Sequence, residues 1–454
     1  MFTFKDCIAT LPVFRFLYDH LHLCSSLGRN ELLQSNFITD AHTLQICFNE
    51  IEAVLTWQNK AQNQIPKVKQ LLTSAQDIFA TLSRLKNNDA LDDIELFEIK
   101  KSALIMNELH QILVSASFSV FELCKVNEVI DILDPEKTRL PYFYIYSAYS
   151  KELTTMRNMS RQTPENEDLL WQISKLENKI RQNLVMKLMP FVAQLEQNLK
   201  YIAKLDVLLT KATLATEWNC CKPEISDHKT SYVALVHPMV TERLKNDNID
   251  FQPVNIELKQ ESCLITGANM TGKSIFLRSI AFSQWIFQFG FYVPAQRATV
   301  MPVEKIHLVS GDSDTEHTGL SSFVNEIFRI DQILKETKTG IKMLVLVDEF
   351  ARTTNPYEGT ALVSAFLEMM NYRNSICLVT THYSNIEGEF RRLRVKGIQW
   401  DKLEQIKSNP RELNKYIDYQ LEDDNEKTAP KEAVKIAEIL AIDDAFISLV
   451  KKYL

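Results

Sequence analysis

The sequence predicts a multidomain protein in which an all-α region is followed by an α/β domain and then by a C-terminal strand with helices. Residues 1–225 contain very few glycines, and most of their apolar residues recur at helical spacing. From about Ser231, short apolar runs alternate with helical segments, which is typical of a parallel sheet with crossover helices. We therefore expect a helical domain over 1–225, an α/β domain over 226–415 and a C-terminal element over 416–454.

Three segments carry specific structural expectations. Apolar residues between Ile173 and Ile202 recur about every 3.6 residues, and Pro190 should kink or split the resulting helix because proline lacks the backbone N–H. The aromatic and β-branched run at 140–149 predicts a strand or a hairpin arm inside the helical domain. Near the C-terminus, residues 417–421 read as a strand, and two helical stretches follow.

Composition and charge exclude several classes of protein. The 51 basic and 58 acidic residues give a net charge of −7, so this is no general nucleic-acid coat protein, and any contact with DNA must be local. The eight cysteines lack CxxC spacing, which favours reduced thiols over a zinc site or a disulfide framework. The charge-free run 279–296 contains several serines and glutamines and predicts a core helix with a turn. We therefore expect a cytoplasmic protein without a membrane segment.

A phosphate-binding loop is the strongest signal in the sequence. Residues 267–274 fit the pattern GxxxxGK[ST], and they stand between the apolar run 263–265 and a predicted helix. In such a loop the backbone N–H groups and the helix N-terminus cradle phosphates, the lysine neutralises them and the serine ligates Mg²⁺. The predicted nucleotide-binding residues are Gly267, Ala268, Asn269, Met270, Thr271, Gly272, Lys273 and Ser274.

Two further apolar runs end in polar residues. The run 343–347 reads as a buried parallel strand and is followed by Asp348 and Glu349. We expect Asp348 to hold Mg²⁺ together with Ser274, and Glu349 to polarise the attacking water. The run 376–379 leads to His382, which is placed to sense the γ-phosphate. With the phosphate-binding loop, these residues predict an ATPase that hydrolyses ATP to ADP and phosphate.

The residues around these motifs resemble the MutS family. Residues 266–274 are similar to the family's Walker A segment, which has Asn-Met before Gly-Lys-Ser. Other similar segments follow in the family's order: 237–238, 290–295, 320–326, 348–359 and 381–383. The resemblance covers nearly the whole chain. It implies a helical lever with a short inserted clamp at about 140–210, followed by an ABC-type ATPase domain that dimerises with two composite sites.

The resemblance also implies roles for residues outside the phosphate-binding loop. Phe251 is similar to the aromatic residue on which the adenine stacks in this family. Ser321 or Ser322 of one subunit would approach the γ-phosphate held by the other, and the C-terminal helices resemble a dimerisation element. The partner would be a second copy or a related subunit.

Two departures from the family pattern bear on function. Only about 20 residues precede the lever, which leaves no room for a mismatch-recognition domain. The loop after Glu349 begins Phe-Ala-Arg-Thr-Thr-Asn-Pro, whereas mismatch sensors have Gly-Arg-Gly-Thr-Ser-Thr in place of the last six residues. We therefore expect DNA binding of the mismatch-repair or recombination type without true mismatch reading.

Two hypotheses stay open for what the clamp grips. Residues 151–211 hold ten Lys or Arg and seven Asp or Glu, a local excess that allows contacts with DNA phosphates. The candidate DNA contacts are Arg157, Arg161, Lys175, Lys179 and Arg181. In the alternative, the loop after Glu349 resembles that of MutS-related ATPase subunits of reactivases. Those subunits act on adenosylcobalamin-dependent lysine aminomutases, so the partner would be an aminomutase protein.

Overall fold

The computed structural model describes residues 2–139, 142–268, 271–310, 322–400, 416–424, 433–439 and 442–453. The chain forms two compact units, which we call the helical unit (1–36 and 49–214) and the sheet unit (37–48 and 215–454). Among the described residues, no helix is both long enough and apolar enough to cross a membrane.

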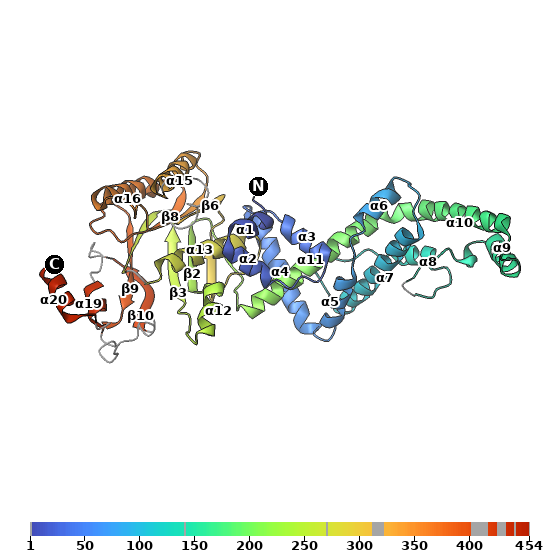
Figure 1. Cartoon of the computed structure of the whole chain (residues 1–454), viewed down its shortest axis with the longest axis horizontal. Helices are drawn as coiled ribbons and strands as arrows, with labels where there is room; N and C mark the ends of the chain where they lie inside the picture. The colour runs from blue at the N-terminus through green and yellow to red at the C-terminus, as the bar shows by residue number, and fades with distance from the viewer. Residues whose placement is uncertain are drawn as a thin grey trace. The chain divides into compact units, whose positions relative to one another are not determined.

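The described part of the helical unit is built from helices (Figure 1). The longest described helix that lies wholly within this unit is α7 (Asp93–Ser115), and Asp92 caps its N-terminus. In this capping box the Asp92 side chain accepts the Glu95 N–H, and the Glu95 side chain accepts the Asp92 N–H. The helices are α1 (Phe4–Thr10), α2 (Pro12–Asp19), α3 (Ser26–Gln34), α4 (Ala41–Lys60), α5 (Ile65–Ser74), α6 (Phe79–Lys86), α7 (Asp93–Ser115), α8 (Asn127–Leu133), α9 (Lys151–Gln162), α10 (Glu167–Leu188) and α11 (Val192–Glu217), of which α4 and α11 continue into the sheet unit.

The predicted split at Pro190 is confirmed. The residue lies in a single 3-10 turn, η2 (Met189–Phe191), which separates α10 from α11. Apolar residues at helical spacing are buried on both sides of the turn, Leu184 and Leu188 before it and Leu195 and Leu199 after it. The hydrophobic period therefore continues through the break, while the backbone hydrogen-bond pattern does not.

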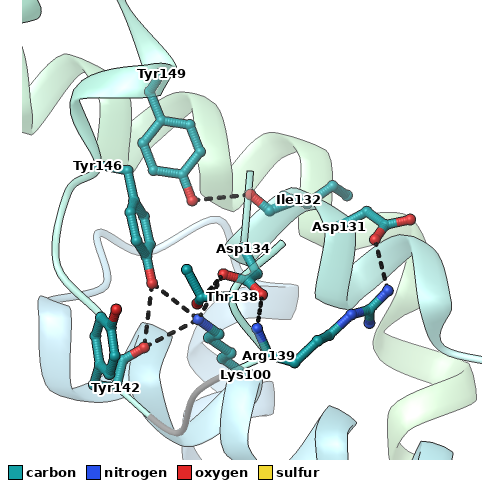
Figure 2. A network of polar contacts seen from close by, with 9 residues as sticks. All are labelled: Lys100, Asp131, Ile132, Asp134, Thr138, Arg139, Tyr142, Tyr146 and Tyr149. Carbon is teal, nitrogen blue, oxygen red and sulfur yellow. Dashed lines mark hydrogen bonds and ion pairs between the residues drawn. The ribbon is translucent and has the colours of Figure 1, made fainter. Parts of the chain in front are cut away.

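The prediction of a strand or hairpin arm at 140–149 is wrong for the residues that the structure describes. Residues 142–146 have no regular structure and lead into a 3-10 turn, η1 (Ser147–Tyr149). The Lys100 ammonium donates to the carbonyl of Tyr142 (3.1 Å) and to the hydroxyl of Tyr146 (2.9 Å), as Figure 2 shows. The Lys100 ammonium also lies 5.5 Å and 5.3 Å from the ring centres of Tyr142 and Tyr146, so these two residues surround a buried cation instead of forming a strand.

The sheet unit contains a six-stranded sheet in the order β10-β9-β4-β8-β7-β6. Its strands are parallel except for β10, which runs antiparallel to β9. Their bounds are β4 (Ser262–Thr266), β6 (Lys305–Ser310), β7 (Met343–Asp348), β8 (Ser375–Thr380), β9 (Arg391–Ile398) and β10 (Ile417–Asp423). The three predicted parallel strands and the C-terminal strand are confirmed. The parallel order brings the carboxyl ends of β4, β7 and β8 together at one edge, where open sheets bind ligands.

Helices cover both faces of this sheet (Figure 1). α13 (Lys273–Gln288) packs on β7, while α15 (Ser322–Thr337) packs on β6 and α16 (Pro356–Asn371) packs on β8 and β4. Most of α13 is buried, and Gly290 follows with φ +68°, as a core helix ending in a turn requires. Two short C-terminal helices, α19 (Ala433–Ile439) and α20 (Asp444–Lys452), match the predicted helical stretches.

A second, four-stranded sheet has the order β1-β5-β2-β3. It consists of β1 (Glu224–Ile225), β2 (Lys229–Leu235), β3 (Val254–Lys259) and β5 (Arg297–Val300), and α12 (Pro238–Asn246) connects β2 with β3. The N-terminal segment 37–48 also belongs to this unit. It joins the end of α13, where the Ile38 N–H donates to the Gln288 carbonyl (2.8 Å) and the Gln288 side chain donates back to the Ile38 carbonyl (2.9 Å).

Candidate nucleotide-binding site

The predicted phosphate-binding loop connects the end of β4 to the first turn of α13. Gly272 caps the helix with φ +80°, a left-handed conformation that glycine adopts without a side-chain clash. A Cβ atom on Gly272 would lie only 2.9 Å from the Tyr419 ring, so a glycine is needed here for space as well. Asn269 and Met270 lie outside the described residues.

Lys273 is held inside the loop. Its side chain is 5% exposed, and its ammonium donates to the carbonyls of Gly267 (2.6 Å) and Ala268 (2.9 Å). Burial lowers the pKa of Lys273, whereas the charges of Glu349 and Asp348 raise it in part. The lysine therefore sits within the electrostatic reach of both carboxylates at the end of β7.

Thr380, which the sequence interpretation missed, links the Asp348 carboxylate to the backbone of Glu349. Its hydroxyl donates to Asp348 Oδ1 (2.7 Å) and accepts the Glu349 N–H (2.9 Å). The hydroxyl can do both because β7 and β8 are adjacent parallel strands that end side by side. A polar residue directly after the apolar run 376–379 was the only signal that could have indicated this role.

Glu349 leaves the end of β7 in a left-handed conformation with φ +51°. Its carboxylate forms an ion pair with Arg352, whose Nη1 lies 2.8 Å from Glu349 Oε2. His382 is exposed on the segment that follows β8. Partial burial lowers the pKa of His382, the Glu349 charge raises it, and the Arg352 charge lowers it.

A polar cavity of about 490 Å³ brings the predicted catalytic residues together. Its walls come from the start of α13 and from the segments that follow β7 and β8. It is lined by Thr271, Gly272, Lys273, Ser274, Ile275, Glu349, Arg352 and His382. The cavity places a cationic side chain, a serine hydroxyl, a carboxylate and an imidazole around one volume. This set suits a polyphosphate with a divalent cation and an attacking water.

An apolar cavity of about 230 Å³ adjoins the polar one. The two share Thr271, Gly272 and Ile275, so they meet at the first turn of α13. Phe251 lines the apolar cavity as expected, and Tyr419 of β10, which the sequence interpretation did not select, lines it too. The other lining residues are Leu235, Val240, Leu244, Ile249, Asp250, Gln252, Val254, Phe276, Ser279, Val395 and Leu421.

The predicted DNA contacts differ in their surroundings within the helical unit. Arg157 pairs with Glu177 (2.7 Å) and Arg181 with Asp93 (2.7 Å), so both guanidinium groups are held by carboxylates of this chain. The Lys175 ammonium lies 5.0 Å from the centre of the Trp171 ring. Arg161 and Lys179 are exposed. Of the predicted trans residues, Ser321 lies outside the described residues and Ser322 begins α15.

One family model matches this part of the chain. Residues 263–450 match MutS domain V. Domain V is the ATPase domain of MutS-family proteins, and the match runs from β4 to α20. It therefore includes the predicted phosphate-binding loop, Asp348 at the end of β7, Glu349 after it, and His382. The match supports the resemblance to the MutS family and indicates an ATPase.

Proposed function

We propose that the chain is a MutS-type ATPase that binds ATP with Mg²⁺ across the two adjoining cavities and uses its hydrolysis to move a DNA-binding helical unit. The observation that carries this proposal is the junction of the cavities at Gly272. An apolar volume with two aromatic residues suits a nucleobase, and the adjacent polar volume suits its phosphates.

The residues of the polar cavity divide the work of hydrolysis. Lys273 places a positive charge beside the β- and γ-phosphates, and the backbone N–H groups at the start of α13 point toward the same volume. Mg²⁺ would neutralise developing charge when held by Ser274 and Asp348. Glu349 accepts a proton from the attacking water once its carboxylate is released from Arg352. His382, which lines the same cavity, senses the γ-phosphate.

The proposed active species is a dimer. α20 exposes two large apolar side chains, Phe446 and Leu449, and Ile442 is exposed just before it. Such a face suits a second subunit, either a copy or a related chain, because exposed apolar residues gathered on one helix are costly in water. Ser321 or Ser322 would then complete the site of the partner.

Two substitutions test the ATPase. Lys273→Ala removes the positive charge that would face the phosphates and should weaken nucleotide binding. Glu349→Gln preserves the shape of the side chain but removes the base, so ATP should bind while turnover falls about 10²–10⁴-fold. Glu368→Gln, on the exposed face of α16, is the matched control and should hydrolyse ATP at the parental rate. Turnover by Glu349→Gln at the parental rate would refute the assignment of the base.

The alternative, remodelling of an aminomutase, has two structural observations in its favour. Two of the five predicted DNA contacts are already paired with carboxylates, and α9 and α10 expose Met159, Leu170 and Trp171. An apolar surface of this kind suits a protein partner better than a phosphate backbone. Binding assays with a branched DNA junction and with an adenosylcobalamin-dependent lysine aminomutase, in parallel, separate the two hypotheses.

A further inference from the structure

The peptide groups of Ala351 are held from two sides, two residues after the candidate base. The Ala351 N–H points at both carboxylate oxygens of Glu326, each 3.3 Å away. The Ala351 carbonyl accepts a hydrogen bond from the Tyr383 hydroxyl at 2.6 Å. Glu326 belongs to α15 and Tyr383 follows β8, so two separate elements grip the loop that follows β7.

The backbone of this loop is strained at two positions. Glu349 has φ +51° and Ala351 has φ +61°, both in the left-handed region that residues with a Cβ rarely adopt. Each costs about 1–2 kcal/mol relative to the ordinary conformations. Strained backbone of this kind persists only where surrounding contacts hold it, and the contacts here are those of Glu326 and Tyr383.

Both gripping side chains are buried, and Tyr383 belongs to an apolar cluster that includes part of the loop itself. Ala351, Tyr383, Phe350 and Phe366 are buried members of that cluster, and Glu326 lies on α15 with its side chain largely covered. Gly359 of α16 makes room for the tyrosine, because a Cβ there would lie 2.5 Å from its ring. A carboxylate in such surroundings is costly unless it is hydrogen-bonded, and its acceptor oxygens face a single peptide N–H near the base.

We propose that Glu326 and Tyr383 are positioning residues for hydrolysis: by fixing the Ala351 backbone they set the direction in which the Glu349 carboxylate leaves the end of β7. Neither residue lines the polar cavity, so both act through Glu349 and neither touches the nucleotide. This inference rests on the proposed ATPase function, in which Glu349 is the base.

The first test separates the chemical step from binding. Tyr383→Phe removes one hydroxyl and keeps the ring in its pocket, and Glu326→Ala removes the acceptor of the Ala351 N–H. Both should lower kcat about 10–100-fold, because a misplaced catalytic group loses rate without losing substrate affinity. The dissociation constant of a non-hydrolysable ATP analogue should change less than about twofold. Glu326→Gln retains an acceptor oxygen and should recover most of the rate lost in Glu326→Ala.

Tyr372→Phe is the matched control, because Tyr372 is an exposed tyrosine at the end of α16. It should retain the parental kcat. Retention of the parental kcat by Tyr383→Phe and Glu326→Ala, alongside an inactive Glu349→Gln, would overturn the positioning role while leaving the ATPase assignment intact. If Glu326→Ala does not fold, Tyr383→Phe and Glu326→Gln still decide the question.

A second measurement shows whether the two residues act through the base. In a Glu349→Gln background the carboxylate that they position is gone, so adding Tyr383→Phe should leave the residual rate unchanged. A further tenfold loss in that background would mean that Tyr383 acts elsewhere and would refute the proposal. If Glu349→Gln itself turns over at the parental rate, the assignment of Glu349 as the base fails first, and a parent chain that does not hydrolyse ATP would refute the ATPase itself; both outcomes are distinct from the other two.

Discussion

Arg352 forms an ion pair with Glu349, and both side chains line the same cavity as His382. The two charges act on the imidazole in opposite directions, since Glu349 raises the pKa of His382 and Arg352 lowers it. Arg352→Gln should therefore raise the pKa of His382, and Glu349→Gln should lower it. Titration of the His382 ring signals by NMR, assigned with His382→Gln, measures both shifts. Shifts in the same direction would show that the two charges do not face the imidazole as the structure has them.

The apolar cavity should contribute to ATP binding through the nucleobase and not through the phosphates. Phe251→Ala removes an aromatic wall and should weaken ATP binding about tenfold to a hundredfold, the range expected for loss of one buried aromatic contact. Inorganic triphosphate lacks a base, so its affinity should be the same for the parent and the variant. Competition binding against a fluorescent nucleotide gives both values. An equal loss of affinity for ATP and for triphosphate would place Phe251 outside the region that binds the nucleobase.

The Lys100–Asp134 pair should be a major determinant of the stability of the helical unit. The two side chains are 0% and 1% exposed, and their polar atoms lie 3.2 Å apart (Figure 2). Burial alone raises the pKa of Asp134, but the Arg139 N–H, the Thr138 hydroxyl and the Lys100 ammonium outweigh it, so the pKa lies below the usual range. Lys100→Met leaves this carboxylate buried without its cation and should lower the free energy of unfolding by about 3–5 kcal/mol.

The double variant Lys100→Met, Asp134→Asn removes both charges. It should be less destabilised than Lys100→Met alone, because no uncompensated charge stays buried. Urea unfolding of the parent, both single variants and the double variant measures the coupling. Strictly additive effects would mean that the two side chains do not interact.

Glu326 should give the sheet unit a characteristic pH dependence of stability. Burial raises the pKa of Glu326 from 4.5 to about 7, although the Ala351 N–H lowers it in part. Between these values the folded chain keeps the proton and the unfolded chain releases it, so this contribution to stability is lost as the pH rises through that window. Glu326→Gln does not titrate. Relative to the parent, it should gain on the order of 3 kcal/mol in unfolding free energy from pH 4.5 to 7.5. The exposed Glu368→Gln should show no such trend.

If the helical unit binds DNA, its basic residues should contribute unequally. Arg161 and Lys179 are exposed, whereas Arg157 and Arg181 are held by Glu177 and Asp93. Arg161→Ala and Lys179→Ala should weaken binding and reduce its salt dependence. Arg157→Ala should instead mainly reduce stability. Titrations of perfect and G·T-mispaired duplexes at two salt concentrations check this, and both duplexes should bind alike. A preference for the mispair that persists at high salt would contradict the expected absence of mismatch reading.

The local features of this protein could be predicted from sequence because their causes are local. A pattern within eight consecutive residues defines the predicted phosphate-binding loop, and a run of apolar residues defines β7. Pro190 ends α10 because proline lacks the backbone N–H. The run at 142–149 shows the limit of such reasoning. Its residues have strand propensity, but the buried Lys100, far away in the sequence, takes the Tyr142 carbonyl and the Tyr146 hydroxyl.

The residues that complete the site depend on the tertiary structure. Thr380 acquires its role only because β8 lies beside β7, and Tyr419 reaches Gly272 only because β10 pairs with β9 at the edge of the sheet. The grip of Glu326 and Tyr383 on Ala351 joins residues 25 and 32 positions apart in the sequence. The sequence by itself determined the phosphate-binding motif, since eight contiguous residues carry it. The tertiary structure decided what surrounds that chemistry, because such contacts form only between segments that folding brings together.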